Sequence, residues 1–132
     1  MTTQEDHKKV VEEYFQLIEE GKPKESLHLF APNCKQHNPY LKGGMDALLQ
    51  AIVDMQGEEP ESEDPYFEVK NILADGDMVA AHTVLINSKS NPSKGGLRQI
   101  HLFRFGQDNK IVEYWDVTQM ILSEMPAAAN AF

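Results

Sequence analysis

The spacing of apolar residues is helical in the first half of the chain. Apolar side chains recur three or four positions apart between Val10 and Ile18, which is the spacing of one helix face. Thr3 and Asp6 resemble a capping box placed ahead of this run. The first half therefore predicts a helix that Gly21 ends, a short helix over 24–30, a short extended piece and a turn over 35–44, and a helix over 45–55.

The second half alternates apolar and polar residues, which is the pattern of strands. Four strands are predicted, over 67–74, 78–87, 97–105 and 110–118, with hairpin turns at 75–77 and 106–109 and a polar loop at 87–96. Because no repeat or boundary interrupts the chain, we expect one domain over 1–132 with a C-terminal tail over 120–132. Helices followed by meandering antiparallel strands predict an α+β fold, with the helices on one face of the sheet.

Alternation divides every strand into two faces. Tyr114 and Asp116 share a face of the last strand, and His101 and Phe103 share a face of the strand before it. We assign His82 to the same side, so that His82, His101 and Asp116 are expected to converge. The opposite faces are also largely apolar, so we expect other parts of the protein, or a partner, to shield both sides of the sheet from water.

Asp116 interrupts the otherwise apolar strand sequence KIVEYWDVTQ. Aspartate is a poor strand former, and it is rarely buried without a partner. We therefore expect Asp116 to be buried and hydrogen-bonded to a histidine or a tyrosine, first of all His101 or Tyr14. Two interpretations stay open: Asp116 is a catalytic acid or base, or it is a structural acceptor that ties down neighbouring side chains.

Composition and charge exclude several classes of function. The chain has 132 residues, of which 41% are hydrophobic and 25% charged, with a net charge of −9. Nucleic acid and anionic membranes would repel such a chain, so neither is an expected partner. Five carboxylates fall in GEEPESEDP, residues 57 to 65, which indicates a solvated loop. No segment resembles a membrane span or a signal peptide, and the single cysteine, Cys34, leaves no disulfide within the chain, so we expect a cytoplasmic protein.

A metal or cofactor is not expected. The candidate histidines form no HxH or HxxxH pattern, which argues against a metal site. Cys34 has no base beside it in the sequence and is interpreted as a small buried residue. His7 and His28 lie in predicted helices and are expected to face solvent.

The order of elements, together with QHNP, LFRF and KIVEYWDVTQ, resembles the SnoaL-like branch of the nuclear transport factor two-like superfamily, from the first helix to about Gln119. This resemblance implies a cone in which a strongly curved sheet wraps a long helix and leaves a deep pocket. The superfamily includes polyketide cyclases, ketosteroid isomerase and limonene epoxide hydrolase, so fold alone does not define the activity.

The resemblance also implies roles for particular residues. The tyrosine of ketosteroid isomerase falls on Tyr14, its base falls on Asn38 and its aspartic acid falls on His101. Asparagine cannot act as a general base, so the steroid reaction is not expected by that route. A catalytic aspartate of limonene epoxide hydrolase falls on Asp116, and the same alignment places His82 and His101 on the pocket side.

The leading hypothesis is an enzyme performing acid–base chemistry, of the aldol cyclisation or isomerisation type, on a small, mostly apolar carbonyl compound. Asp116 and His101 are the expected catalytic residues, and the expected substrate contacts are Tyr14, His37, Asn38, His82, Phe103 and Tyr114. One alternative is an epoxide-hydrolase-like enzyme in which Asp116 activates water. The other is a protein of the same fold that binds a small ligand without chemistry.

We expect a homodimer built on the sheet face opposite the pocket. The residues assigned to that face are Trp115, Val117, Ile100, Leu102, Ala81, Thr83 and Leu85. A contiguous apolar surface of this kind usually marks an interface, and similar proteins commonly pair sheet against sheet.

Overall fold

Three helical segments precede the sheet in the computed structural model, which describes residues 2–60 and 62–132. Helix α1 spans Gln4–Glu19, and its first turn is closed by the predicted capping box, in which Asp6 N donates to Thr3 Oγ1 and Thr3 N donates to Asp6 Oδ2. A short 3-10 helix, η1, spans Pro23–Leu29, and helix α2 spans Met45–Gln56. All three helical segments agree with the predicted ones within about two residues at each end.

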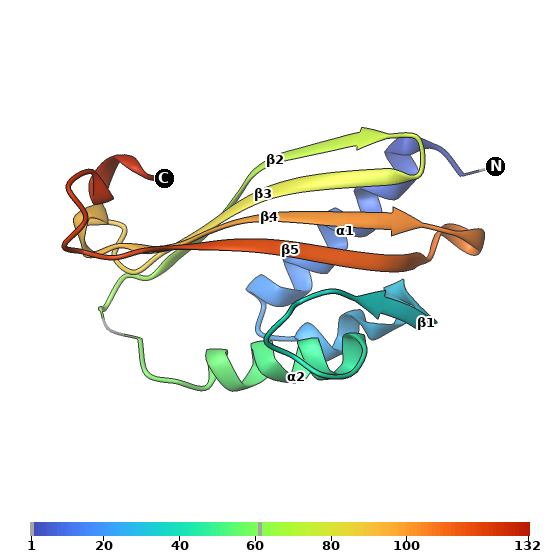
Figure 1. Cartoon of the computed structure of the whole chain (residues 1–132), viewed down its shortest axis with the longest axis horizontal. Coiled ribbons are helices and arrows are strands. Elements are labelled where there is room, and N and C mark those ends of the chain that lie inside the picture. Colours follow the sequence, from blue (N-terminus) through green and yellow to red (C-terminus); the bar gives the residue numbers. More distant parts are fainter. Residues whose placement is uncertain (1, 61) are drawn as a thin grey trace.

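Five strands form one sheet in the order β1-β5-β4-β3-β2 (Figure 1). Their bounds are β1 Phe30–Gln36, β2 Tyr66–Asp75, β3 Met78–Ile86, β4 Gly96–Phe105 and β5 Ile111–Ile121. Short 3-10 turns lie at Pro92–Lys94 (η2), Gln107–Asn109 (η3) and Ala128–Asn130 (η4). The four predicted strands and the α+β class are confirmed.

Strand β1 corrects the expected all-antiparallel sheet. It pairs in parallel with β5 at the edge, whereas the other neighbouring strands are antiparallel. The sequence FAPNCKQ contains a proline and three polar residues, so its pattern does not predict a strand over the whole segment. Proline is tolerated there because an edge strand needs only one of its two rows of hydrogen bonds.

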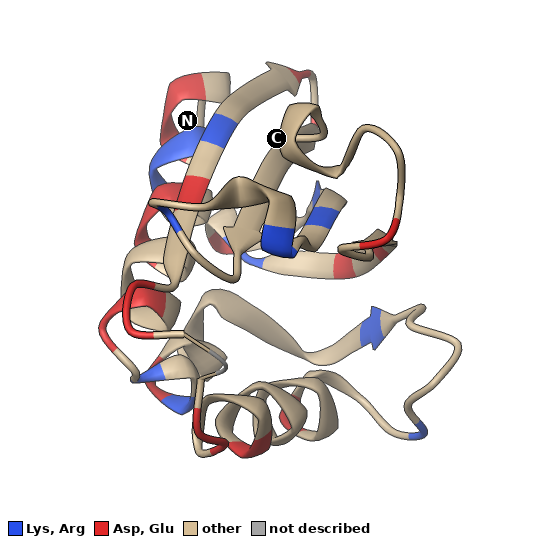
Figure 2. Ribbon diagram, turned by 90° about the vertical axis from the view of Figure 1, so that its left-hand side faces the viewer, with Lys and Arg blue, Asp and Glu red and all other residues tan. Residues whose placement is uncertain are grey.

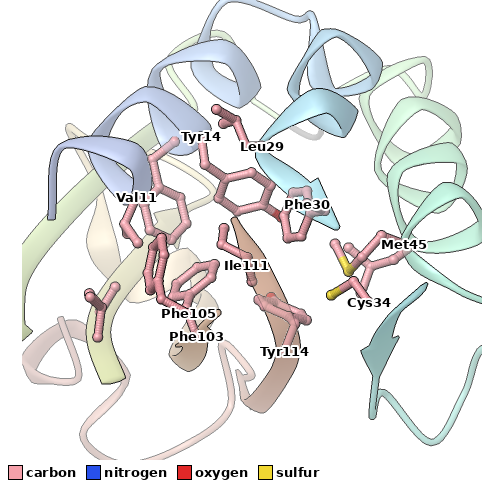
Figure 3. Packing of buried hydrophobic residues seen from close by; sticks show 14 of the residues in the cluster. Val11, Tyr14, Leu29, Phe30, Cys34, Met45, Phe103, Phe105, Ile111 and Tyr114 are labelled. Carbon is pink, nitrogen blue, oxygen red and sulfur yellow. The ribbon is translucent and has the colours of Figure 1, made fainter. Parts of the chain in front are cut away.

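The core lies between α1 and the concave face of the sheet. Val11, Tyr14 and Phe15 of α1 are buried against side chains from β4 and β5 (Figure 3). Phe103, Ile111 and Tyr114 supply that sheet side and are almost completely buried. The ring of Tyr14 meets the ring of Phe103 edge to face, with centroids 5.7 Å apart. Packing of this kind fixes where α1 crosses the sheet and therefore where the pocket can open.

The face assigned to β3 from alternation is wrong. Ala81 is the partner of His101 in the antiparallel register, and His82 is the partner of Ile100. Residues that are paired across strands share a face, so His82 lies on the convex side, away from His101. By the same register Ala81, Thr83 and Leu85 lie on the concave side and do not belong to the predicted dimer surface.

Strand β3 is buried in part on its convex side as well, near the C-terminal segment. Val84 and Ile86 are buried although they lie on the convex side. Val84 is paired with Arg98, and Arg98 Nη1 donates to the carbonyl oxygen of Ala131 at 2.8 Å. The last residues of the chain therefore return over this end of the sheet, as Figure 1 shows. β5 extends to Ile121, so the tail is shorter than the predicted 120–132.

Two helical histidines differ in their surroundings. His28 is exposed, as expected, but His7 is buried, so the expectation for His7 is wrong. His7 Nδ1 lies 2.7 Å from Asn109 Oδ1, and the His7 ring stacks on Phe105 with centroids 4.3 Å apart. These contacts tie α1 to the β4–β5 turn. Among the described helices, none is both long and apolar enough to cross a membrane.

Candidate functional site

A cavity of about 330 Å³ lies between the concave face of the sheet and the ends of α1 and α2. Most of its walls are apolar, and the side chains that form them include Phe15, Ile18, Leu48, Ile52, Phe67 and Leu85. Polar groups reach it from β4 and β5, namely Gln99, His101, Tyr114 and Asp116. An apolar cavity with a few convergent polar groups is the usual form of a small-molecule site.

Asp116 reaches this cavity from β5 and is held by Asn38. Asn38 Nδ2 donates to Asp116 Oδ1 at 3.2 Å and to Oδ2 at 3.3 Å. Asn38 is itself fixed, because its Oδ1 accepts from Tyr40 N at 2.9 Å and its backbone N donates to Gln36 Oε1 at 2.8 Å. The loop after β1 thus orients the carboxylate before any ligand arrives.

The expected hydrogen bond from His101 or Tyr14 to Asp116 is absent. Asp116 is half-buried rather than fully buried; Asn38 Nδ2 donates to its carboxylate, and the Tyr114 hydroxyl interacts with the same carboxylate. His101 stands directly opposite Asp116 in the β4–β5 register, but its ring bonds elsewhere. The convergence of His101 and Asp116 on one face is confirmed, whereas their direct pairing is wrong.

His101 is a buried, doubly hydrogen-bonded imidazole. Its Nδ1 lies 2.7 Å from the Tyr114 hydroxyl, and its Nε2 lies 2.9 Å from Thr83 Oγ1. Burial lowers the pKa of His101 to about 4, so the ring is uncharged at neutral pH. A neutral imidazole has one donor and one acceptor nitrogen. The ring therefore either accepts from Thr83 and donates to Tyr114, or donates to Thr83 and accepts from Tyr114.

Two tyrosine hydroxyls remain protonated beside the carboxylate. Burial raises the pKa of Tyr14, and the charge of Asp116 raises it further. Burial also raises the pKa of Tyr114, with added contributions from Tyr14 and Asp116. The Tyr14 and Tyr114 ring centroids are 6.5 Å apart. Both phenols therefore act as hydrogen-bond donors near Asp116 throughout the physiological pH range.

Three predicted substrate contacts lie outside the cavity. His37 is exposed, stacks on Trp115 with centroids 4.9 Å apart, and places Nε2 2.7 Å from Glu113 Oε2. His82 lies on the convex face, as its register shows. Phe103 is completely buried in the core behind the cavity. The other predicted contacts, Tyr14, Asn38 and Tyr114, do line the cavity.

Thr83 and Gln99 belong to the site but are not assigned a role from sequence. Gln99 faces the cavity two residues before His101, and its Nε2 donates to Thr118 Oγ1 at 2.8 Å. The alternation of β4 already places it on this face. Thr83 could not be found in this way, because the faces of β3 are reversed in the sequence-based assignment.

Cys34 does not extend the chemistry of the site. It is buried, and burial followed by the nearby Glu113 charge raises the pKa of its thiol to about 11. A protonated thiol is a poor nucleophile. Within residues 2–60 and 62–132, no three His, Cys, Asp or Glu side chains gather closely enough to hold a metal ion.

A curved sheet wrapped around a helix, with a carboxylate and tyrosines lining its pocket, is the architecture that the resemblance to the SnoaL-like family implies. The family model described as a SnoaL-like domain matches residues 11–114. The chain therefore belongs to the SnoaL-like domain family, as its sequence motifs suggest. Among curated proteins, none matches the sequence.

Solved structures share the fold at low sequence identity. AclR from Streptomyces galilaeus gives a TM-score of 0.70 at 16% identity, over 89% of this chain and 91% of that chain. A steroid delta-isomerase from Pseudomonas aeruginosa gives 0.62 at 16% identity, over 96% of this chain and 85% of that chain. A de novo designed protein with a curved β-sheet gives 0.66 at 17% identity, over 87% and 86%. Because a designed protein shares the fold, the activity has to be argued from the site.

Proposed function

We propose that the protein is an acid–base enzyme that acts on a small, mostly apolar carbonyl compound, by isomerisation or aldol cyclisation. The observation that carries this proposal is the oriented carboxylate of Asp116 in the wall of an apolar cavity, beside two protonated tyrosine hydroxyls. A carboxylate that accepts a proton and phenols that donate hydrogen bonds are the two groups needed to form an enolate.

In the proposed step, Asp116 removes a proton from the carbon next to the carbonyl. The electron pair of the C–H bond becomes the C=C bond of the enolate, and the carbonyl π pair moves onto oxygen. A hydroxyl of Tyr114 or Tyr14 donates a hydrogen bond to that oxygen. Where a C=C bond of the substrate is conjugated with the enolate, Asp116 returns the proton to the far carbon of the dienolate, and the substrate is isomerised. Where the enolate carbon attacks a second carbonyl, the alkoxide that forms takes the proton from Asp116, and a ring is closed.

His101 holds Tyr114 in this proposal and does not carry the proton. Because Tyr114 has to donate into the cavity, its oxygen accepts from His101 Nδ1–H, and His101 Nε2 accepts from the Thr83 hydroxyl. Asn38 uses its amide N–H groups on Asp116, so it orients the base instead of stabilising the oxyanion. The sequence-based roles of His101 and Asn38 are changed accordingly.

The test is deuterium incorporation into an apolar ketone. Incubation of 2-tetralone with the protein in D₂O, followed by NMR, measures α-proton exchange without knowledge of the natural substrate. We expect exchange faster than in buffer, a return to the buffer rate in Asp116→Asn, and a loss of about a hundredfold or more in Tyr114→Phe. Glu113→Gln, on the same strand but facing away, is the matched control and should exchange normally.

Binding of the ketone with no acceleration of exchange would defeat the enzymatic proposal and favour a binding protein of the same fold. Opening of an epoxide probe by the wild-type chain but not by Asp116→Asn, with no ketone exchange, would favour the alternative in which Asp116 activates water. Steroid isomerisation at the rates of a dedicated isomerase is not expected, because Asn38 occupies the position of that base.

A further inference from the structure

The described residues that line the cavity include two carboxylates, Asp116 and Glu19, and neither lysine nor arginine. Asp116 lies on the inner wall formed by β5, and Glu19 lies at the exposed end of α1. The cavity therefore presents negative charge both inside and at its entrance. A ligand that enters the cavity is therefore attracted or repelled by these carboxylates, according to its own charge.

No positive group inside the described cavity offsets Asp116. Asn38, its hydrogen-bond partner, is neutral. His101 is the basic side chain of the lining, and its ring is uncharged at neutral pH because burial lowers its pKa to about 4. The surrounding walls are apolar, so water screens the carboxylate less than it would at an open surface.

The entrance is acidic as well. Gln56, the last residue of α2, and Phe67, near the start of β2, both line the cavity, so the loop that joins these elements begins and ends beside it. That loop carries Glu58, Glu59, Glu63 and Asp64, while the fifth carboxylate, Glu61, lies outside the described residues. Figure 2, which views the molecule from the end where this loop lies, shows red segments on the left and lower parts of the ribbon, with blue segments among them.

Lys89 contacts this loop through its backbone, but its charged group is directed elsewhere. Lys89 N donates to Asp64 O at 2.9 Å, but Lys89 Nζ lies over the ring of Tyr66 at 4.4 Å. Tyr66 precedes the cavity-lining Phe67 in β2, and successive strand residues point to opposite faces. The Lys89 charge therefore sits on the convex side and does not neutralise the cavity.

We infer that the cavity selects its ligands by charge: it admits apolar compounds that are uncharged or carry a basic nitrogen, and it rejects compounds that carry an acid group. The inference rests on the proposed function and narrows its substrate class. The carbonyl compound is a ketone, aldehyde or ester with no carboxylate or phosphate on the part that enters the cavity.

Three matched probes test the inference: 2-naphthylmethanol, 2-naphthylmethylamine and 2-naphthoate. They share one apolar body and differ in carrying no charge, a positive charge and a negative charge at neutral pH. Dissociation constants come from NMR titration of the wild-type chain at pH 7. We expect the alcohol and the amine to bind, the amine more tightly, and the carboxylate to bind at least about tenfold more weakly than the alcohol.

Asp116→Asn identifies the source of the selection. The variant keeps the size of the side chain and removes its charge, so the amine should lose its advantage and the carboxylate should gain affinity. Binding of the alcohol, unchanged in the variant, confirms that the cavity is intact. Glu113→Gln removes a charge from the same strand on the opposite face, and it should leave all three dissociation constants unchanged.

The outcomes separate the two levels of the proposal. If the alcohol binds and the carboxylate binds as tightly, charge selection is wrong while the proposed function survives. If the carboxylate is rejected equally by Asp116→Asn and by the wild-type chain, Asp116 is not the cause and the inference is again overturned. If none of the three probes binds to either protein, the cavity is not a small-molecule site and both proposals fail.

Discussion

Asp116 and Asn38 lie 78 positions apart in the chain, yet each depends on the other. The carboxylate needs a hydrogen-bond donor in a mostly apolar wall, and the amide needs an acceptor. The sequence alone identifies Asp116 as unusual, because an aspartate interrupts an apolar strand. It does not identify the partner, because that choice depends on where the loop after β1 lies against β5.

A substitution at Asn38 tests this dependence. Asn38→Asp places a second carboxylate within about 3.2 Å of the first. At pH 7.5 the two charges repel, and we expect a loss of about 1 to 4 kcal/mol in the free energy of unfolding relative to wild type. At pH 4.5 one proton shared by the pair should restore most of the loss. Urea unfolding of both proteins at both pH values measures it.

Asn38→Ala is the matched control for this measurement. It removes the same hydrogen bonds to Asp116 without adding a charge, so its deficit relative to wild type should not recover on acidification. Equal deficits of Asn38→Asp at the two pH values would contradict the close contact between these side chains.

His101 makes stability depend on pH in a defined direction. Its pKa is about 4 in the folded chain and 6.5 in the unfolded chain, so below pH 6.5 the unfolded chain binds more protons. The stability contributed by the neutral ring is present above pH 6.5 and is lost as the pH falls toward 4. Between pH 7 and pH 5 the expected loss from this one residue is about 2 kcal/mol.

The comparison with His101→Gln isolates this effect. The glutamine variant keeps a polar side chain that does not titrate, and every other ionisable group is shared with wild type. Its free energy of unfolding should therefore fall less between pH 7 and pH 5, by about 2 kcal/mol. Parallel pH profiles for the two proteins would show that His101 is not held neutral by the fold.

At the scale of the elements, β3 shows where sequence-based reasoning reaches its limit. Alternation correctly separates His82, Val84 and Ile86 from Ala81, Thr83 and Leu85. It cannot say which set faces the core when both are apolar, and here they are. Val84 and Ile86 are buried on the convex side, at the end of the sheet where Arg98 donates to Ala131 of the C-terminal segment.

In β4 and β5 the two faces differ more, so alternation alone predicts which face lines the cavity. Each carries polar, cavity-lining groups on one face, and exposed apolar side chains such as Leu102 and Val117 lie on the other. The resemblance to the family predicts the pocket, and alternation predicts that His101, Tyr114 and Asp116 face it. Because the predicted faces of β3 are reversed, the prediction wrongly includes His82 in the site and omits Thr83.

Strand β4 begins at a glycine, Gly96, that lies directly against the backbone of β3. Gly96 has φ +154°, and a Cβ atom there would lie 2.0 Å from the carbonyl oxygen of Leu85. The backbone cannot move aside as a flexible side chain can. Gly96→Ala should therefore lower the free energy of unfolding by roughly 3 kcal/mol or more, which is a large loss for a single substitution. Because Leu85 and Leu97 line the cavity, affinity for 2-naphthylmethanol should fall as well.

Gly76→Ala is the control for that substitution. Gly76 also has a positive φ, of +62°, but a Cβ there would have no atom within 4 Å. It should cost only the left-handed backbone penalty of about 1 to 2 kcal/mol and leave the cavity unchanged. Equal losses for the two variants, measured by urea unfolding, would show that the contact with Leu85 is unimportant.

At the scale of the whole molecule, the convex face presents an uncovered apolar surface. Across the sheet, Leu73, Ala80, Leu102 and Trp115 form one row of paired positions, and His82, Ile100 and Val117 form the next. Val117 is 70% exposed, Leu73 68% and Ile100 45%. Helices α1 and α2 lie on the other side of the sheet and cannot cover these residues (Figure 1).

We propose that a second copy of the chain covers this face. The corrected surface lacks Ala81, Thr83 and Leu85 but gains Leu73 and Ala80, so it still spans four strands. Polar groups border it, since Arg104 Nε lies 3.7 Å from Glu113 Oε1 and Arg104 Nη1 lies 3.2 Å from Asp77 Oδ2. An apolar centre with a polar rim is the usual anatomy of an interface.

Val117→Asp tests the proposal with little risk to the fold, because the side chain is already mostly exposed in the single chain. In a two-fold dimer the substitution acts twice and brings like charges into an apolar interface, so the wild-type dimer should become a monomer. Sedimentation velocity at micromolar concentration measures the mass, and the far-ultraviolet circular dichroism should stay unchanged. Thr118→Asp, one residue along on the cavity side, should remain dimeric. A wild-type chain that sediments as a monomer, or a Val117→Asp variant that stays dimeric, would place the interface elsewhere or remove it.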